Sequence, residues 1–558
     1  MNVKKKKVIL ATSQNPNWPL FVALNKEGKN EEGLIVYYNK TFQNDVDFLP
    51  VEIDFLEQKN VNNQLEISLY LQTLFTNKEK TPQIVLSDYS SALVVKEFGK
   101  NLNFDKTNLS STIFETNVQK KLNPHEQNFS MLNLPFNVND IDSLRFNLNT
   151  FEKIIEIIKQ GGGHIDSNLD VNLMIQIKKN KGNKLPKNSL LRVLKPKNSN
   201  VFQDLIVSNQ TFENIFESLE FANKFVQGIT FDKSKISNLD DFSDDFNLFV
   251  IDYSDQIFLK AFISSNFVTT AKLTNDKIFQ QLSNSQKLID KFTSQIKLFT
   301  KNNQIELQIG EKKKIVNAVK FKDWRKSEWG GYDILHQKAA FGYVTGVGIR
   351  CSVDSLVTRN KFANNGHDFA KIQTFATYSN IFTKPQVVKA SQNSLSSVYW
   401  LGGSSLITIK SDDAQIDKAT IKFLEWIYTG DILIGGKKIP TWEYIILKSG
   451  YFLPLASLTN KHTLKLLEKK YQNIYTKVYK NEQKYGPSTN FETRDSAVIP
   501  WDDYLTLFNL NSAILSLQSL LNAINNSKTT YLFNDSSNQK VAKARKLIFE
   551  YILKNNVG

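Results

Sequence analysis

The stretch LGGSSLITIKSDDAQIDKATIKFLEWIYTGD, residues 401–431, decides the fold. After a glycine turn, residues 404–409 are predicted to form a strand, and an amphipathic helix follows. The apolar positions of the helix recur at spacings of three and four: Ile416, Ala419, Phe423 and Ile427. Such a stripe packs inward while the polar face meets water, so the pattern predicts one strand–helix unit of an α/β protein.

The ends of this helix also carry sequence signals. Asp412 and Asp413 stand where unpaired amide groups and the positive end of the helix dipole favour acidic residues. Gly430 follows the last turn, and we expect it to end the helix in the left-handed conformation.

Length and composition set the scale of the molecule. A chain of 558 residues is too long for a single hydrophobic core, so two or more lobes are expected. The hydrophobic fraction of 41% and the 39 phenylalanines supply enough apolar surface for such cores. No stretch approaches the roughly 20 apolar residues that span a bilayer.

The net charge of +15 has two interpretations. A polyanionic partner, such as nucleic acid or a membrane surface, would explain it. The nucleotide bias of an AT-rich genome, visible in the abundance of Lys, Asn, Phe and Ile, also explains it and is the interpretation we favour. The positive charges are scattered, apart from the runs 4–7 and 312–314. Charge alone therefore does not name the ligand.

The single cysteine, Cys351, excludes an internal disulfide. Scarce cysteine is typical of the cytosol, and it also fits a wall-less bacterium that exports proteins without disulfide chemistry. Residues 1–7 are a basic tail that lacks the apolar run of a signal peptide. The cellular compartment stays open on these observations.

The N-terminal third alternates strand and helix patterns. Buried-strand runs at 8–12, 46–56 and 81–91 are separated by helical periodicity, which predicts a parallel α/β sheet. Open sheets of this kind bind ligands at the carboxyl ends of their strands, where the loops 13–18 and 87–90 lie. These loops supply the candidates Asn15, Asn17, Trp18, Asp88 and Tyr89, because sugar sites need flat aromatic faces and planar polar groups. We expect Asp88 to be exposed in its loop.

Several phrases resemble the extracellular solute-binding proteins of ABC importers of the maltose-binding type. In the helix of 401–431 the matching residues are Ala419, Thr420, Phe423, Leu424 and Trp426. The turn SGYFLP at 449–454 is similar to a turn of the same family. The opening ATSQNPNWPL resembles a group of mycoplasma surface lipoproteins. The resemblance spans most of the chain from 8 to 500, and its specific phrases cover about a fifth of that span.

The resemblance implies an α/β, two-lobed periplasmic-binding-protein-like fold of type II, its lobes joined by three hinge crossovers. The first lobe would comprise 1–131 plus 331–385, and the second 132–330 plus 386–558. The strand of 401–431 would then lie in the second lobe. The polar stretch 165–210 and the basic loop within 300–330 depart from the family pattern and would be insertions.

Family positions also imply further ligand-binding residues. Arg350 and Asp354 would close the wall of the first lobe, and Tyr399 and Trp400 would form the facing rim of the second. Trp442 and Tyr451 are weaker candidates on the same grounds. For every aromatic residue the competing interpretation is a packing role.

Catalysis finds little support in the sequence. It has no nucleophile elbow, no phosphate-binding lysine loop, no zinc-protease helix and no paired cysteines, and its five histidines are dispersed. We therefore expect no enzyme activity, no metal and no cofactor. The triple glycine at 161–163 is expected to end a helix rather than to cradle a phosphate.

The resemblance implies a monomeric, lipid-anchored protein on the outer face of the plasma membrane, with its leader and lipid-bearing cysteine missing from the sequence. Its partners would be a solute, a sugar or oligosaccharide first, and an ABC permease. The alternative is a surface lipoprotein or adhesin that binds nucleotides, oligonucleotides or a host polymer. The phrase WRKSEW at 324–329, with tryptophans among basic residues, keeps nucleic acid as a possible partner.

Overall fold

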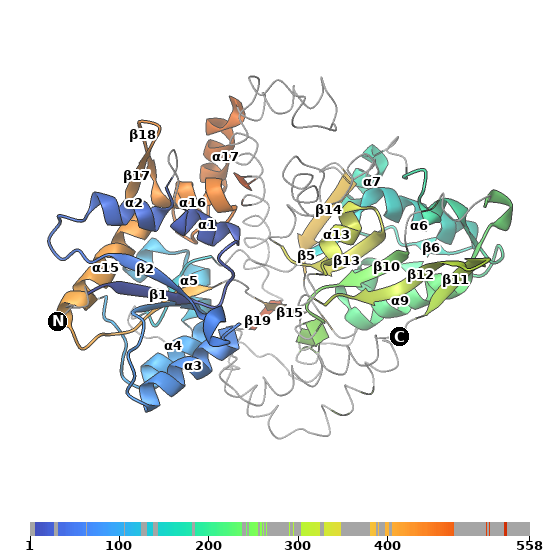
Figure 1. The fold of residues 1–558 in the computed structure, drawn as a ribbon. Coiled ribbons are helices and arrows are strands. Elements are labelled where there is room, and N and C mark those ends of the chain that lie inside the picture. The colour runs from blue at the N-terminus through green and yellow to red at the C-terminus, as the bar shows by residue number, and fades with distance from the viewer. Residues whose placement is uncertain are drawn as a thin grey trace.

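The computed structural model contains two bodies, each built around its own β-sheet (Figure 1). The structure describes residues 6–26, 32–62, 64–104, 107–123, 131–137, 143–180, 185–236, 245–254, 303–323, 328–346, 380–386, 397–400, 404–473 and 529–532, with isolated residues between them. No described helix has the length and apolar character needed to cross a membrane.

The first lobe is organised by a five-stranded sheet in the order β2-β1-β3-β16-β4. Its strands are β1 (Val8–Thr12), β2 (Val51–Phe55), β3 (Ile84–Ser87), β4 (Leu134–Pro135) and β16 (Ser405–Thr408). β1 runs parallel to β2 and β3, and β16 runs antiparallel to β3 and β4. The parallel strands confirm the α/β interpretation of the N-terminal third.

Helices cover both faces of this sheet. One face packs on α1 (Pro19–Asn25), α2 (Leu34–Thr41), α15 (Ala414–Thr429) and α16 (Thr441–Ser449). The other packs on α3 (Gln64–Thr76) and α4 (Tyr89–Glu97). Leu10 and Leu86 serve the first core while Ala11 and Val85 serve the second, as the two-residue alternation of a strand requires.

The helix α15 forms where the sequence predicts it. Asp413 caps its first turn by accepting the N–H of Gln415 at 2.9 Å, and Ala419, Phe423 and Ile427 are buried. The prediction for Gly430 is wrong: its backbone is extended, with φ −85°. Glycine is needed there for space, because a Cβ would lie 2.3 Å from the Trp426 ring.

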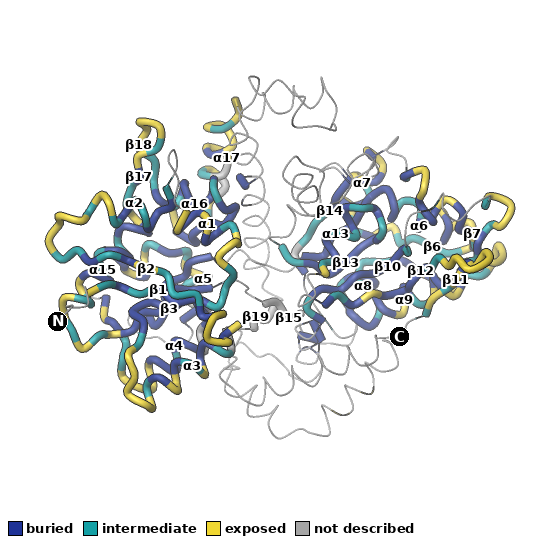
Figure 2. The backbone as a smooth tube through the Cα atoms, viewed as in Figure 1, coloured by how far each residue is buried: buried dark blue, intermediate teal, exposed yellow. Residues whose placement is uncertain are grey.

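The second lobe is organised by a six-stranded mixed sheet in the order β11-β12-β10-β13-β5-β14. Its strands are β5 (Ser143–Asn147), β10 (Phe246–Ile251), β11 (Gln304–Ile309), β12 (Lys312–Phe321), β13 (Ala339–Val344) and β14 (Ile381–Pro385). The helices α6 (Leu148–Gln160), α7 (Val171–Lys179) and α9 (Ile215–Gly228) share the main core on one face, and α13 (Gly330–Leu335) lies on the other. Figure 2 shows the buried strands inside both lobes and exposed hairpins at their outer ends, among them β11–β12.

Two connections between the lobes can be followed from the strand pairings. β4 of the first sheet is followed by β5 of the second, and β14 of the second is followed by β16 of the first. Between β14 and β16 the short strand β15 (Ser397–Trp400) pairs in parallel with β19 (Thr529–Leu532). This two-lobed arrangement confirms the expected fold class.

The predicted domain boundaries differ from the sheets in two places. Strands β13 and β14, assigned to the first lobe within 331–385, belong to the second sheet. Strand β16 and helices α15 and α16, assigned to the second lobe within 386–558, belong to the first. The strand of 401–431 therefore completes the first lobe, because it pairs with β3 and β4.

The segments predicted as insertions are part of the second lobe. Within 165–210, the residues Leu173, Leu191 and Phe202 are buried in its main core. The basic loop expected within 300–330 is largely a hairpin. Its strands β11 and β12 pair from Gln304 opposite Asn317 to Ile309 opposite Lys312. The triple glycine ends α6, with Gly162 at a positive φ of 84°.

Candidate functional site

Both sheets bring the same kind of edge toward the linkers that join the lobes. Ser405 of β16 pairs with Pro135 at the end of β4 and with Ser87 at the carboxyl end of β3. In the second sheet Ser143 pairs with Val344, the carboxyl end of β13. Only eight residue steps separate Pro135 from Ser143, so these edges lie at most about 28 Å apart. The carboxyl ends of the parallel strands in both sheets thus lie next to the connection between the lobes.

Uncharged polar side chains form part of the edge of the first lobe. Thr12 ends β1 and is buried, and its Oγ1 accepts the N–H of Gln14 at 3.1 Å. Ser87 ends β3, where its hydroxyl lies 2.7 Å from that of Ser91. Gln14 reaches Ser404 with its side-chain amide at 3.2 Å. Thr12, Ser87 and Ser404 are buried, and Gln14 is the half-buried member of this network.

The loop after β1 holds three of the predicted residues. Asn15 is half-buried, and its Oδ1 accepts the N–H of Asn17 at 2.9 Å, which fixes the turn. Trp18 precedes the first turn of α1 and keeps 46% of its surface exposed. A large aromatic ring is left free of the core at this edge of the sheet.

Asp88 corrects the sequence interpretation. It lies directly after β3 and is 8% exposed, so it is buried rather than open in its loop. Its backbone carbonyl accepts the N–H of Ser91 at 3.2 Å at the start of α4. Tyr89 is the first residue of α4, and its side chain lies outside the description.

The remaining predicted residues are placed only in part. Arg350 and Asp354 lie outside the described residues. Tyr399 and Trp400 belong to β15, opposite Tyr531 and Leu532, and the structure describes their backbone only. Trp442 and Tyr451 pack with the core of the first lobe, Tyr451 at 7% exposed, which favours the packing role for both.

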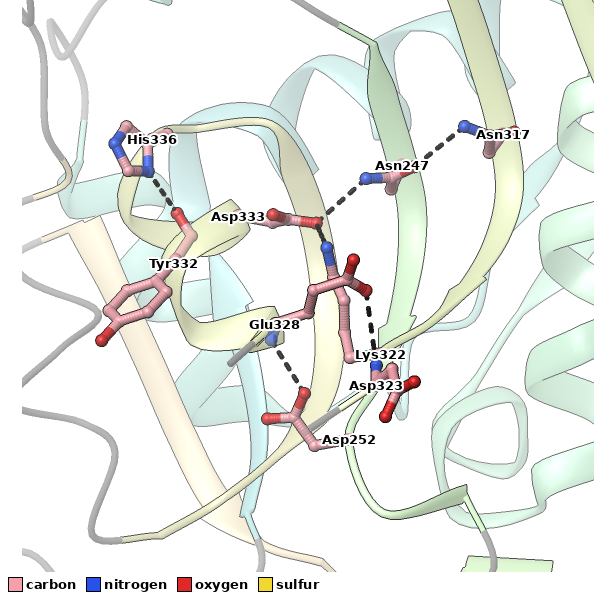
Figure 3. Close-up of polar contacts among 10 residues, drawn as sticks. Asn247, Asp252, Asn317, Lys322, Asp323, Glu328, Tyr332, Asp333 and His336 are labelled. Carbon is pink, nitrogen blue, oxygen red and sulfur yellow. Dashed lines mark hydrogen bonds and ion pairs between the residues drawn. The ribbon is translucent and has the colours of Figure 1, made fainter. Parts of the chain in front are cut away.

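The edge of the second lobe holds charged groups that sequence reasoning missed (Figure 3). Asp252 follows β10 directly, is 3% exposed, and accepts the N–H of Gly330 at 2.8 Å. Burial raises the pKa of Asp252 to about 7, while the Gly330 N–H and the Lys322 ammonium act in the opposite direction. Asp252 sits at the end of a buried strand, the same signal that pointed to the ligand loops of the first lobe.

A second ionic contact stands beside it. The ammonium of Lys322, directly after β12, lies 2.6 Å from the carboxylate of Asp333 on α13. That carboxylate also accepts the side-chain amide of Asn247 at 3.0 Å, and Asn317 donates to Asn247 at 3.0 Å. This series of side-chain contacts connects β10, β12 and α13.

Arg145 is the largest fully buried side chain among the described residues. It lies in the middle of β5, and its guanidinium donates to the Ser143 and Thr383 hydroxyls at 3.1 and 3.3 Å. It also donates to the carbonyls of Thr345 and Gly346 at 3.1 and 3.4 Å. The guanidinium therefore holds the backbone that leaves β13 at the same edge as Asp252.

The two edges differ in chemistry. Among the described residues no three His, Cys, Asp or Glu side chains gather where they could hold a metal ion. The second edge supplies buried charges fixed by hydrogen bonds, and the first supplies hydroxyls, amides and an exposed indole. Polar groups fixed in this way can orient a polar ligand.

No protein-family model matches the chain, and no curated protein sequence matches it significantly. Solved structures are similar to it. A solute-binding protein of Streptococcus pneumoniae in complex with the blood group A-trisaccharide is 10% identical, with a TM-score of 0.45, covering 99% of this chain and 98% of that one. An ABC substrate-binding protein of Listeria monocytogenes in complex with cycloalternan is 9% identical, with a TM-score of 0.45 and coverage of 99% and 97%. An ABC transporter solute-binding protein of Agrobacterium radiobacter in complex with ribitol is 13% identical, with a TM-score of 0.44 and coverage of 98% and 99%. Likenesses of this size do not identify a ligand for this chain.

Proposed function

We propose that this protein is the substrate-binding component of an ABC importer, a surface lipoprotein that captures a sugar or oligosaccharide between its lobes. The observation that carries the proposal is the position of the two polar edges. Both lie at the carboxyl ends of parallel strands, and both adjoin the linkers between the lobes.

The loop 13–18 at the first edge carries no charged side chain, which favours a neutral, hydroxyl-rich ligand. Gln14, Asn15 and Asn17 carry side-chain amides that are half-buried or exposed, and Trp18 presents an exposed indole face. Pyranose rings stack on such faces while their hydroxyls bond to planar polar groups. The wild-type mechanism is non-covalent: the lobes close about the linkers on the ligand, and the closed form is presented to a permease.

A thermal-shift screen tests the proposal. The purified chain is mixed separately with neutral mono-, di- and trisaccharides, with nucleotides and with short oligonucleotides. A ligand that binds only the folded state stabilises it and so raises the melting temperature. At a ligand concentration of a hundred times Kd, the added stability is about 2.7 kcal/mol. We expect a neutral saccharide to do so. A shift with oligonucleotides alone, abolished by salt, would instead support the nucleic-acid-binding alternative.

Trp18→Ala tests the role of the exposed ring. We expect it to weaken saccharide binding about tenfold, because an aromatic contact contributes about 0.5–1.5 kcal/mol beyond the area it buries. Stability without ligand should change by less than about 0.5 kcal/mol, since the side chain is 46% exposed. Isothermal titration calorimetry with the saccharide found in the screen measures the affinity.

Val46→Ala is the matched control for Trp18→Ala. Val46 is 83% exposed in the same lobe and lies before β2, away from the carboxyl edge. Its affinity should equal that of the wild type. Unchanged affinity in the Trp18 variant would remove this ring from the site.

A further inference from the structure

At the first lobe, the ends of the two linkers are joined by hydrogen bonds. Asn137 lies just beyond β4, where the first linker leaves, and Ser404 lies just before β16, where the second returns. The N–H of Ser404 donates to the Asn137 Oδ1 at 3.1 Å, and the N–H of Asn137 donates to the Ser404 carbonyl at 3.1 Å. Both residues are almost fully buried, at 3% and 2% exposed. The two linkers are thereby fixed to one point of the first lobe.

Gln14 joins the candidate ligand loop to that point. Its Nε2 donates to the Ser404 Oγ at 3.2 Å, and its own N–H is held by Thr12. In the sheet β3 stands between β1 and β16, so the Gln14 side chain crosses the carboxyl end of β3 to reach Ser404. One side chain therefore connects the loop that carries Trp18 with the start of β16.

The second lobe holds the other end of the same linker. Gln386 follows β14, is 1% exposed, and accepts the ammonium of the buried Lys260 at 3.1 Å. Farther along, Lys389 forms a bridge with Asn214, at the start of α9. The second linker is thus held at Gln386 and Lys389 on one side and at Ser404 on the other.

We infer that Gln14 is a positioning residue that couples the ligand loop after β1 to the hinge through Ser404 and Asn137. This inference rests on the proposed function, because a ligand held at Trp18 would act on lobe closure through the hydrogen bond between Gln14 and Ser404. A conformational change driven by a ligand requires contacts that differ between the two states. The Gln14–Ser404 hydrogen bond connects the ligand loop to the first-lobe ends of both linkers.

The test measures the distance between the lobes without any ligand. Spin labels are attached at Val46→Cys in the first lobe and Ile206→Cys in the second, both exposed, in a Cys351→Ser background. Double electron–electron resonance then gives the distribution of distances for the full chain. Because no ligand is present, the outcome does not depend on whether the proposed sugar binds.

In Gln14→Ala we expect the population outside the main distance peak to rise about fivefold, the factor by which one hydrogen bond shifts an equilibrium. Gln14→Glu should restore the wild-type distribution, because its carboxylate can accept the Ser404 hydroxyl. Ser404→Ala should reproduce the effect of Gln14→Ala, and the double variant should add nothing further. Gln72→Ala, at an exposed position of α3, is the control that should leave the distribution unchanged.

Two results overturn the inference. One is a wild-type distribution in Gln14→Ala. The other is broadening in Gln14→Ala that Gln14→Glu does not restore. If the saccharide screen fails while the distributions change as expected, the coupling stands and the proposed ligand class falls.

Discussion

Arg145→Met is expected to lower the free energy of unfolding by about 3–5 kcal/mol, the largest effect of any single change considered. The guanidinium is fully buried and is the donor for two hydroxyls and two backbone carbonyls. Methionine fills a similar volume and supplies no donor, so the half-buried carbonyls of Thr345 and Gly346 each lose this hydrogen-bond donor. Urea unfolding followed by circular dichroism measures the loss.

Arg192→Met is the matched control. The Arg192 guanidinium also donates to two backbone carbonyls, those of Leu185 and Pro186, but its side chain is exposed to water. Water can replace those bonds, so we expect a loss below about 1 kcal/mol. Equal effects of the two substitutions would contradict the importance given to the buried position of Arg145.

Asp252→Asn is expected to stabilise the protein at pH 8 by about 2–4 kcal/mol, the cost of a pKa raised from about 4 to about 7. Between those values the folded state keeps a proton that the unfolded state has released. The wild type therefore loses stability as pH rises from about 4 to 7. Below pH 4 both states are protonated, and this destabilisation is absent. The asparagine Oδ1 can still accept the Gly330 N–H, so only the charge is removed.

Urea unfolding at pH 5 and pH 8 measures this difference for wild type and variant. We expect the fall in stability between the two pH values to be smaller in Asp252→Asn than in the wild type. Asp204→Asn, at an exposed position of the same lobe, should keep the wild-type dependence. If Asp252→Asn also keeps the wild-type pH dependence of stability, the Asp252 carboxyl is not the buried titrating group.

Local patterns predicted much of the first lobe. The runs at 8–12 and 81–91 became β1 and β3, and the helix of 401–431 became α15 with its cap at Asp413. These elements are specified by short-range periodicity and by end residues, which a single sequence contains. The loop 13–18 followed from the position of β1, and Trp18 is exposed there as a ligand residue needs to be.

The sheet that each strand joins could not be predicted in the same way. Strand β13, AAFGYV, is buried along its whole length, so its pattern suits the interior of either sheet. Its place is decided by pairing with β10 and β5, which are distant in sequence. The same holds for β16, whose partners β3 and β4 lie more than 250 residues earlier.

The charged residues of the second lobe escaped prediction for a different reason. Asp252 and Lys322 each follow a strand end, and applying the strand-end rule to the run 246–251 would have found Asp252. Arg145 gave no such signal, because an arginine in the middle of a strand usually faces water. Its burial depends on carbonyls at 345–346, supplied by a segment about 200 residues away.

Small-angle X-ray scattering tests the central claim, capture of a ligand between two lobes, most directly. The radius of gyration of the chain is measured alone and with a saturating concentration of the saccharide that raises its melting temperature most. We predict that the radius of gyration falls on binding, because the carboxyl edges at Trp18 and Asp252 close on the ligand. An unchanged radius of gyration with the saccharide bound would contradict the claim.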